Sequence, residues 1–502
     1  MENKLNSRAP INPIDLSPEA RMAKNSFALF LLAIITKGVG LIIAVLIARY
    51  LGAAALGTYA AVLGLSVLLE SIVPLGQPMV IIRSVARDRK IFLSFWLNTS
   101  LTTTLISIIF SLVLIWVVRT FVNNDEYVAC ATILAIYLPI AGLYGIALAF
   151  IQGLEQMDAM TITAFIGRVA GLLILWLLLE SGQGVTSAFV SHGLYQLVAL
   201  LTLSVAILRK ASRLGVTLEA RLNVNQSLST LRVSVPFALQ TLLRTGLFLI
   251  SILILPLFVD MESVGMFDAA DRIRQTSVMI IPIVTLSILP TLSRMIITDR
   301  NKAESLIQTA LKVVNVFILP FVFVTAICAD QIIPLLYGSG YESAIPVLWI
   351  VAWAQVFFAA DAVLNQVLIV SENEVPMVRF TAISLGFSVM LLVIFASRGG
   401  AMAAAWIVLI TQALNFMLDA VFIVKHVTPL KFSITIGKPL LCAFISGCLA
   451  LVSHSLGLWV SMFLYCGSYL IFLRVFKVFS TSEVHMARQV TEKFWRKVYV
   501  PR

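Results

Sequence analysis

Long apolar runs recur along the whole chain, and no other feature constrains the fold as strongly. An α-helix needs about 20 apolar residues to cross the hydrocarbon core of a bilayer. Fourteen runs meet this requirement. They lie near residues 26–48, 58–82, 91–118, 127–151, 159–179, 185–208, 234–258, 275–297, 310–333, 343–370, 377–396, 401–424, 436–456 and 458–479. The sequence therefore predicts an all-α integral membrane protein with about 14 transmembrane helices.

The overall composition agrees with this prediction. Apolar residues make up 60% of the chain and charged residues 12%, whereas soluble domains contain about 45–50% apolar and about 25% charged residues. A single buried core does not account for the difference, because a soluble protein of this length needs a large polar surface. The excess of apolar residues must face lipid, which argues against a soluble multidomain enzyme.

Lys and Arg are distributed unevenly between the two sides of the predicted membrane domain. With the N-terminus inside, the cytoplasmic segments hold 28 of the 36 Lys and Arg residues, and the outer segments hold 5. This asymmetry predicts a multi-pass protein with both termini cytoplasmic. The basic loops are expected to lie against anionic membrane lipids. The net charge of +11 therefore gives no reason to expect nucleic acid as a partner.

The two parts of the chain resemble each other when the sequence is shifted by 208 residues. Glycines and a proline, which punctuate helices, then fall into register. The matched pairs include Ser26 with Ser234, Gly38 with Gly246, Gly57 with Gly265 and Pro74 with Pro282. Six spans separate the copies, so the repeats have the same topology, as in transporters with parallel repeats. Chance similarity between two apolar stretches is the alternative.

The repeat also predicts how the chain is divided. We expect a cytoplasmic N-terminal tail (1–25), an N-lobe with six spans (26–208), a basic cytoplasmic linker (209–233), a C-lobe with six spans (234–425), and a C-terminal segment with two further spans and a basic tail (426–502).

Several short motifs resemble those of a known transporter family. In the first half, residues 46–52 read LIARYLG, residues 56–60 LGTYA and residues 82–87 IRSVAR. In the second half, residues 264–267 read VGMF and residues 333–338 IPLLYG. Over residues 20–425 the chain resembles the polysaccharide or oligosaccharide flippases of the multidrug/oligosaccharidyl-lipid/polysaccharide (MOP) exporter superfamily.

The resemblance implies two six-helix lobes around a central cavity, in the bacterial cytoplasmic (inner) membrane. It implies alternating access that moves an oligosaccharide linked to a polyprenyl diphosphate, of the undecaprenyl type, to the outer leaflet for surface polysaccharide synthesis such as O-antigen. Polysaccharide polymerase machinery is an expected partner, and no cofactor or enzymatic activity is implied. Relatives flip the peptidoglycan lipid precursor or expel drugs, and both functions remain alternatives.

Three basic residues, Lys37, Arg168 and Arg244, lie deep within predicted spans. Such a charge costs on the order of 3 kcal/mol at a helix centre, so it usually faces a cavity or a partner. Lys37 and Arg244 occupy nearly equivalent places in the repeats, and we expect both to hold the diphosphate in one shared cleft. Pairing with internal acids is the alternative. Gln240 and Asn98 are candidates for binding sugar hydroxyls, or for hydrogen bonds between helices.

Acidic residues at similar depth are candidates for coupling transport to an ion gradient. Glu70 lies on the second span, and Asp361 and Asn365 form an i, i+4 pair on the tenth. Either acid is a candidate site for H⁺ or Na⁺. The alternative for Glu70 is that it neutralises Lys37.

The sequence predicts structural roles for three other polar residues. Asp419 is expected at the cytoplasmic interface, and His192 is expected to pack between helices. Arg49 is expected to snorkel to the outer interface.

An integral-membrane glycosyltransferase, polymerase or ligase is the enzymatic alternative, and such enzymes have a large outer loop with catalytic acids. The longest predicted outer loop, about 259–274, has no DxD motif. Its charged residues are Asp260, Glu262, Asp268, Asp271, Arg272 and Arg274. The sequence therefore favours a transporter over an enzyme. A drug or cation exporter would need acids to dominate the cavity, whereas bases predominate at midplane depth.

Overall fold

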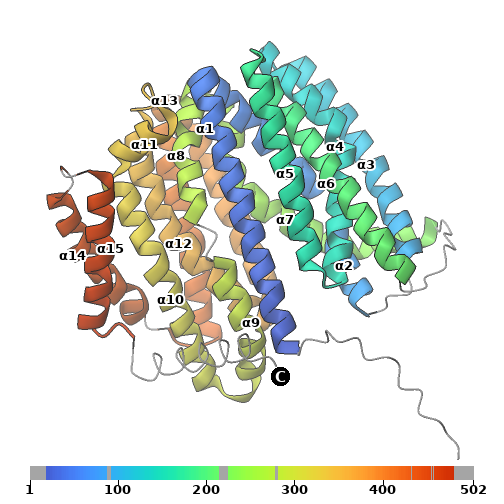
Figure 1. The fold of residues 1–502 in the computed structure, drawn as a ribbon. Coiled ribbons are helices and arrows are strands. Elements are labelled where there is room, and N and C mark those ends of the chain that lie inside the picture. Colours follow the sequence, from blue (N-terminus) through green and yellow to red (C-terminus); the bar gives the residue numbers. More distant parts are fainter. Residues whose placement is uncertain are drawn as a thin grey trace, which may run out of the picture.

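The computed structural model describes residues 18–87, 92–213, 224–277, 281–430, 432–453, 455 and 457–479. All regular elements in these ranges are helical (Figure 1). The helices are α1 (Pro18–Ile72), α2 (Gln77–Arg87), α3 (Phe92–Phe121), α4 (Asp125–Gly153), α5 (Met157–Glu180), α6 (Thr186–Arg213), α7 (Val224–Ile254), η2 (Leu255–Leu257), α8 (Met261–Thr276), α9 (Ile281–Thr298), α10 (Arg300–Ile327), α11 (Ala329–Tyr337), α12 (Ala344–Val370), α13 (Glu374–His426), η4 (Ser433–Gly437), α14 (Lys438–Val452) and α15 (Leu458–Val475).

Eleven helices in the described ranges are long and apolar enough to span a membrane. Two of them, α1 and α13, each contain one glycine in a non-helical conformation, Gly52 (φ 85°) and Gly400 (φ 53°). Each glycine separates two helical segments, and these segments match four of the predicted spans. Helices α8 and α9 together replace one more predicted span. The prediction of an all-α membrane protein with about 14 spans is therefore confirmed.

Most helices fall into two groups, with α1, α7 and α8 between them (Figure 1). On one side, α3, α4, α5 and α6 pack against one another. On the other side, α12 packs against α10 and α13, and α14 and α15 lie at the edge of the molecule against α10. Helix α1 contacts both α5 and α8, so it connects the two groups. Helices α1, α7 and α8, which carry polar residues, therefore lie at the centre of the molecule.

Helices α1 and α8 cross at two glycines that the 208-residue shift aligns. A Cβ atom at Gly57 would lie 1.8 Å from the carbonyl oxygen of Met261, and one at Gly265 would lie 2.0 Å from that of Ala53. The same shift pairs Ala53 with Met261, so the two contacts are reciprocal. A two-fold relation between the halves would produce such a contact. The division into two lobes nevertheless stays a prediction.

A second contact between the halves lies on the predicted outer side. Arg49 on α1 donates hydrogen bonds to the carbonyl oxygens of Leu336 (2.8 Å) and Leu335 (2.5 Å) near the end of α11. Carbonyl groups in the last turn of a helix lack partners within that helix, and a guanidinium satisfies them well. Arg49 therefore connects α1 to α11, where the sequence suggested that it only snorkels to the interface.

The halves also meet on the opposite, predicted cytoplasmic side. Gly76 (φ 74°), in the turn between α1 and α2, approaches α7 so closely that a Cβ atom would lie 2.3 Å from the carbonyl oxygen of Ser234. The Arg83 guanidinium lies 5.0 Å from the centre of the Phe237 ring. Contacts between the halves are thus present on both sides of the membrane domain.

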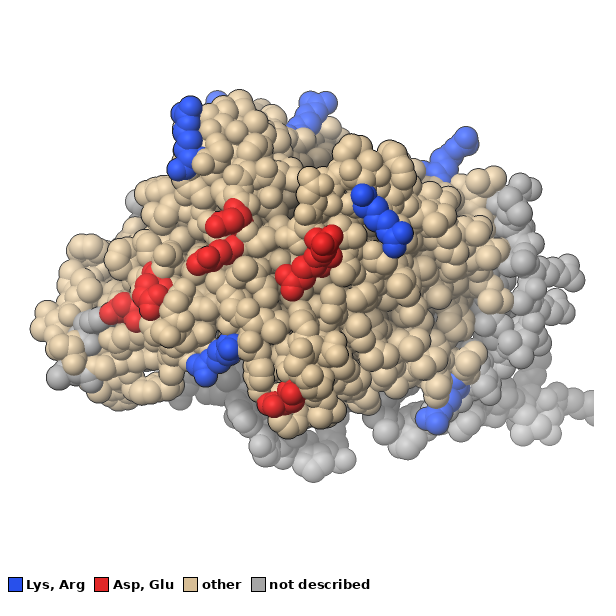
Figure 2. Space-filling view, turned by 90° about the horizontal axis from the view of Figure 1, so that it is seen from above, with Lys and Arg blue, Asp and Glu red and all other residues tan. Residues whose placement is uncertain are grey.

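The face seen in Figure 2 is mostly uncharged, and its acidic and basic side chains are dispersed. This view shows no continuous basic patch of the kind that nucleic acid requires.

Candidate functional site

A cavity of about 240 Å³ lies between the two groups of helices. It is lined by residues of α1, α5, α6, α7, α8 and α13. The ionisable side chains along its wall, apart from the tyrosine Tyr59, are Lys37, Arg168, His192, Asp268, Asp271, Arg272 and Arg274. Two of the predicted cations, Lys37 and Arg168, therefore share one cavity with a set of charges on α8.

Lys37 and Arg168 both lie beside aromatic rings. Lys37 Nζ is 5.7 Å from the centre of the Phe248 ring and donates a hydrogen bond to Gln275 Oε1 at 3.1 Å. The Arg168 guanidinium is 4.8 Å from the centre of the Tyr195 ring, and its buried Nε has no hydrogen-bond partner in the described part of the chain. Aromatic faces stabilise cations in an apolar environment. Neither cation forms an ion pair with any described carboxylate.

The prediction of an outer loop over 259–274 is wrong, because most of it forms α8. The side chain of Asp260 caps this helix by accepting a hydrogen bond from the backbone N–H of Ser263. Opposite charges within the helix neutralise each other, with Arg272 Nε 2.5 Å from Asp268 Oδ2 and Arg274 Nε 2.6 Å from Asp271 Oδ1.

These four charged residues on α8 were missed as site residues because a hydropathy scan treats them as loop. Their i, i+4 and i, i+3 spacing, with opposite signs, was a signal for a helix. The pairing makes it possible for four charged side chains to lie at the centre of the molecule.

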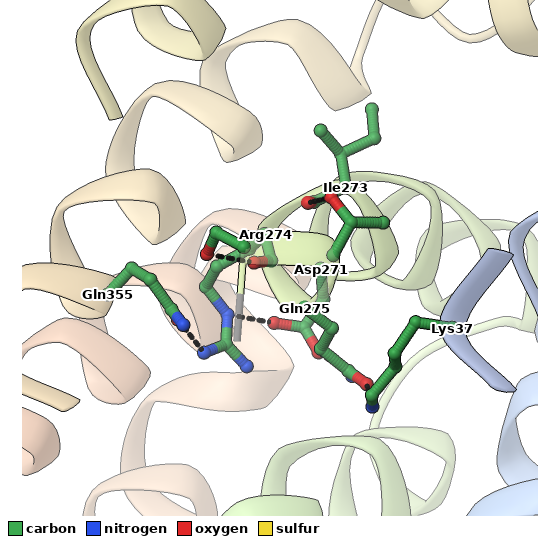
Figure 3. A network of polar contacts seen from close by, with 8 residues as sticks. Lys37, Asp271, Ile273, Arg274, Gln275 and Gln355 are labelled. Carbon is green, nitrogen blue, oxygen red and sulfur yellow. Dashed lines mark hydrogen bonds and ion pairs between the residues drawn. The ribbon is translucent and has the colours of Figure 1, made fainter. Parts of the chain in front are cut away.

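A chain of polar contacts runs from α1 through α8 to α12 (Figure 3). Lys37 donates to Gln275, and Gln275 Nε2 donates to Asp271 Oδ2 at 2.7 Å. Asp271 also accepts from Arg274, and Arg274 Nη1 donates to Gln355 Oε1 at 2.9 Å. The network connects the first half of the chain with two helices of the second.

Arg244 lies in a second pocket of about 40 Å³ and does not line the cavity with Lys37. The prediction of one shared cleft therefore differs from the structure. Phe248, one turn beyond Arg244 on α7, lines both the cavity and the pocket. The other two predicted sugar-binding residues are placed elsewhere: Gln240 is half-buried on α7 and Asn98 is buried on α3, and neither is among the described residues that line these two sites.

Carboxyl and amide groups gather beside Arg244. Asp361 Oδ2 accepts hydrogen bonds from Asn365 Nδ2 at 2.8 Å and from Asn415 Nδ2 at 3.1 Å. Asp419 lies one turn beyond Asn415 on α13, and its carboxyl interacts electrostatically with that of Asp361. Asp419 is only 1% exposed, so it is buried between helices and does not face water. The reason is that α13 packs along α12 and turns its polar stripe toward Asp361.

Glu70 lies within a cluster of polar groups in the first half of the chain. Its Oε1 accepts hydrogen bonds from Ser66 Oγ at 2.7 Å and from Gln196 Nε2 at 2.9 Å. His192 Nε2 lies 3.6 Å from the same oxygen. Glu70 is therefore paired with His192, and Lys37 is not among its described partners. The sequence predicts only that His192 packs between helices. In the structure its side chain also lines the cavity.

Comparison with known proteins places this arrangement in a family. The model of the polysaccharide biosynthesis protein family matches residues 22–296, more than half of the chain. A protein of Escherichia coli K12 named "Putative O-antigen transporter" is 25% identical over 202 residues, which cover 40% of this chain and 48% of that protein. The match thus spans about half the length of that relative.

Solved transporter structures share the fold. The lipid II flippase MurJ in an inward closed conformation has a TM-score of 0.75 at 14% identity, covering 90% of this chain and 98% of that one. An inward-facing multidrug MATE transporter of the MOP superfamily has a TM-score of 0.62 at 15% identity, covering 79% and 97%. These neighbours are transporters and not enzymes, in agreement with the sequence. The chain belongs to the polysaccharide biosynthesis protein family and has the fold of the MOP-superfamily transporters.

Proposed function

We propose that the protein is a flippase for an oligosaccharide linked to a polyprenyl diphosphate, of the undecaprenyl type. It moves this substrate from the cytoplasmic to the outer leaflet by alternating access, for the synthesis of a surface polysaccharide. The observation that carries the proposal is the pair of cations, Lys37 and Arg168, that face one central cavity without a carboxylate partner among the described residues.

The chemistry of the two cations suits a diphosphate. A diphosphate that leaves the headgroup layer needs counter-charge, because an unpaired anion in a low-dielectric environment is costly. Arginine binds phosphate oxygens in a bidentate manner, and lysine acts as a point charge. The aromatic rings beside both cations keep them at this depth in the absence of substrate.

The size of the cavity supports a cycle of opening and closing. Its volume of about 240 Å³ is below the roughly 300–1,000 Å³ of pockets that enclose drug-sized ligands. The glycan therefore enters only after the halves separate. Contacts between the halves at Gly57 and Gly265 on one side, and at Gly76 on the other, supply the places at which separation would occur. The polyprenyl tail stays in lipid throughout.

Two related functions compete with this proposal. The structural similarity to a lipid II flippase favours the peptidoglycan precursor as a second candidate, since that lipid also carries a diphosphate. The family match to polysaccharide biosynthesis supports the first candidate. A cation exporter is disfavoured because the described residues of the cavity wall include four Lys and Arg residues against two Asp residues.

Two clusters are candidates for coupling to H⁺ or Na⁺. In the first half, the Glu70 carboxylate lies 3.6 Å from His192 Nε2. In the second half, Asp361, Asn415 and Asp419 each have a buried oxygen that lacks a hydrogen-bond partner among the described residues. Oxygen ligands suit a small hard cation, and two neighbouring carboxyls also suit a shared proton.

The proposal extends to the location and partners of the protein. We place it in the bacterial inner membrane with both termini cytoplasmic, as the distribution of basic residues supports. Polysaccharide polymerase machinery would consume its product on the outer side.

The proposal is tested in a host that depends on this protein for surface polysaccharide. Lys37→Ala and Arg168→Ala are compared with Arg119→Ala, which removes an exposed cation from the end of α3. We expect at least about a tenfold loss of polymer with each cavity variant, because a hydrogen bond to a charged group contributes about 1.5–3 kcal/mol. Accumulation of lipid-linked glycan should accompany the loss. Full polymer output from well-inserted variants of both cavity residues would refute the proposal.

A further inference from the structure

The charges along the cavity wall are only partly available to a substrate. Arg272 is paired with Asp268, and Arg274 with Asp271, at distances of 2.5 and 2.6 Å. All four side chains are at least largely buried, so the pairs are shielded from competing solvent. The two carboxylates of α8 therefore neutralise the two arginines on the same helix.

Among the described residues of the wall, the remaining Lys and Arg side chains are Lys37 and Arg168. His192 also lines the cavity, but it faces Glu70 at 3.6 Å, and a histidine beside an ionised carboxylate adds no net positive charge. The described part of the cavity wall thus offers two uncompensated positive charges. Its other polar groups are neutral: the Ser251 hydroxyl is buried without a hydrogen-bond partner in the described part of the chain, and Thr36 and Thr276 also line the wall.

A diphosphate that links a lipid to a sugar has two ionised phosphates and therefore two negative charges. It neutralises Lys37 and Arg168 completely and leaves no unpaired cation for a further anion among the described residues that line the cavity. We propose that the glycan carried by this protein is uncharged, and that Asp268 and Asp271 set this limit as specificity-determining residues. The inference rests on the proposed function and narrows its substrate to lipid-linked neutral sugars.

The physical basis is the cost of an uncompensated carboxylate. A uronic acid in the cavity would lose much of its hydration without gaining a cationic partner, and its charge would also be repelled by Asp268 and Asp271. Neutral sugar hydroxyls instead bind hydroxyl groups such as that of Ser251. We expect at least a tenfold preference for the neutral glycan, equivalent to about 1.4 kcal/mol.

The experiment uses the full chain in lipid nanodiscs and two polyprenyl-diphosphate disaccharides. One probe ends in glucose and the other in glucuronic acid, so they differ only in the oxidation state of one carbon. The wild-type protein should bind the glucose probe at least tenfold more tightly. Asp271→Asn frees Arg274, so it should improve binding of the glucuronate probe and reduce the difference in affinity between the two probes. Asp268→Asn tests the pair with Arg272 in the same way.

Glu262→Gln is the matched control, because this exposed acid lies on the same helix but does not line the cavity. It should preserve the wild-type preference. Equal or tighter binding of the glucuronate probe by the wild-type protein would overturn the inference and leave the proposed function intact. If the wild-type protein binds neither probe, both the inference and the proposed function are overturned. The wild-type comparison holds even where an Asp variant fails to fold.

Discussion

Replacing Gly57 with Ala should separate α1 from α8 at the point where they cross. The added Cβ would lie 1.8 Å from the carbonyl oxygen of Met261, whereas real Cβ contacts essentially never fall under 3.0 Å. The helices must therefore move apart by at least 1.2 Å, the difference between these two distances. The obstacle is backbone, so a change of rotamer gives no relief. Overpacking of this kind typically costs about 1–3 kcal/mol.

The chain provides controls for this prediction. Gly265→Ala should have a similar effect, because its Cβ would lie 2.0 Å from the carbonyl oxygen of Ala53. Gly38→Ala should have little effect, since no atom lies within 4 Å of its added Cβ on the same helix α1. We would measure the thermal unfolding midpoint of the purified proteins and their polysaccharide output in cells. A Gly57→Ala protein as stable and active as the Gly38→Ala protein would refute the crossing described here.

Three further predictions concern the contacts between halves and the two acidic clusters. Arg49→Ala removes the two hydrogen bonds to α11. A second substitution beside this contact, Ser339→Cys, supplies a thiol that should then react faster with a membrane-impermeant maleimide. An unchanged reaction rate would show that Arg49 does not hold this side closed. Glu70→Gln should abolish acceleration of flipping by a pH gradient in proteoliposomes, and a retained response would place the proton elsewhere. Asp361→Asn should remove any rise in thermal stability on adding Na⁺, and a persisting rise would exclude this pocket as the ion site.

The apolar runs were sufficient to predict the class of fold. A spanning helix must satisfy its backbone groups internally and present about 20 apolar residues to lipid, and both requirements are local in the sequence. Lys37 and Arg168 could be identified for a related reason, because an ionisable residue deep in an apolar run must face something other than lipid. The structure places both at the cavity.

The misassigned residues depended on packing between distant segments. The charges of α8 lower its hydropathy, so the sequence predicts a loop there, although Arg272 and Arg274 are neutralised within the helix. Arg244 was expected beside Lys37, but Phe248 lies between the cavity and the pocket of Arg244. The burial of Asp419 likewise depends on the packing of α13 against α12. These relations involve side chains from separate helices, so no periodicity in one segment reveals them.

The most direct test of the central claim is the affinity of the purified protein for a polyprenyl-diphosphate sugar, measured by native mass spectrometry or in nanodiscs. We predict that the wild-type protein binds this lipid more tightly than the corresponding monophosphate. Combining Lys37→Ala with Arg168→Ala should weaken binding of the diphosphate by roughly 100-fold or more and remove its advantage over the monophosphate. Wild-type affinity in a folded double variant would contradict the claim that these two cations hold the substrate.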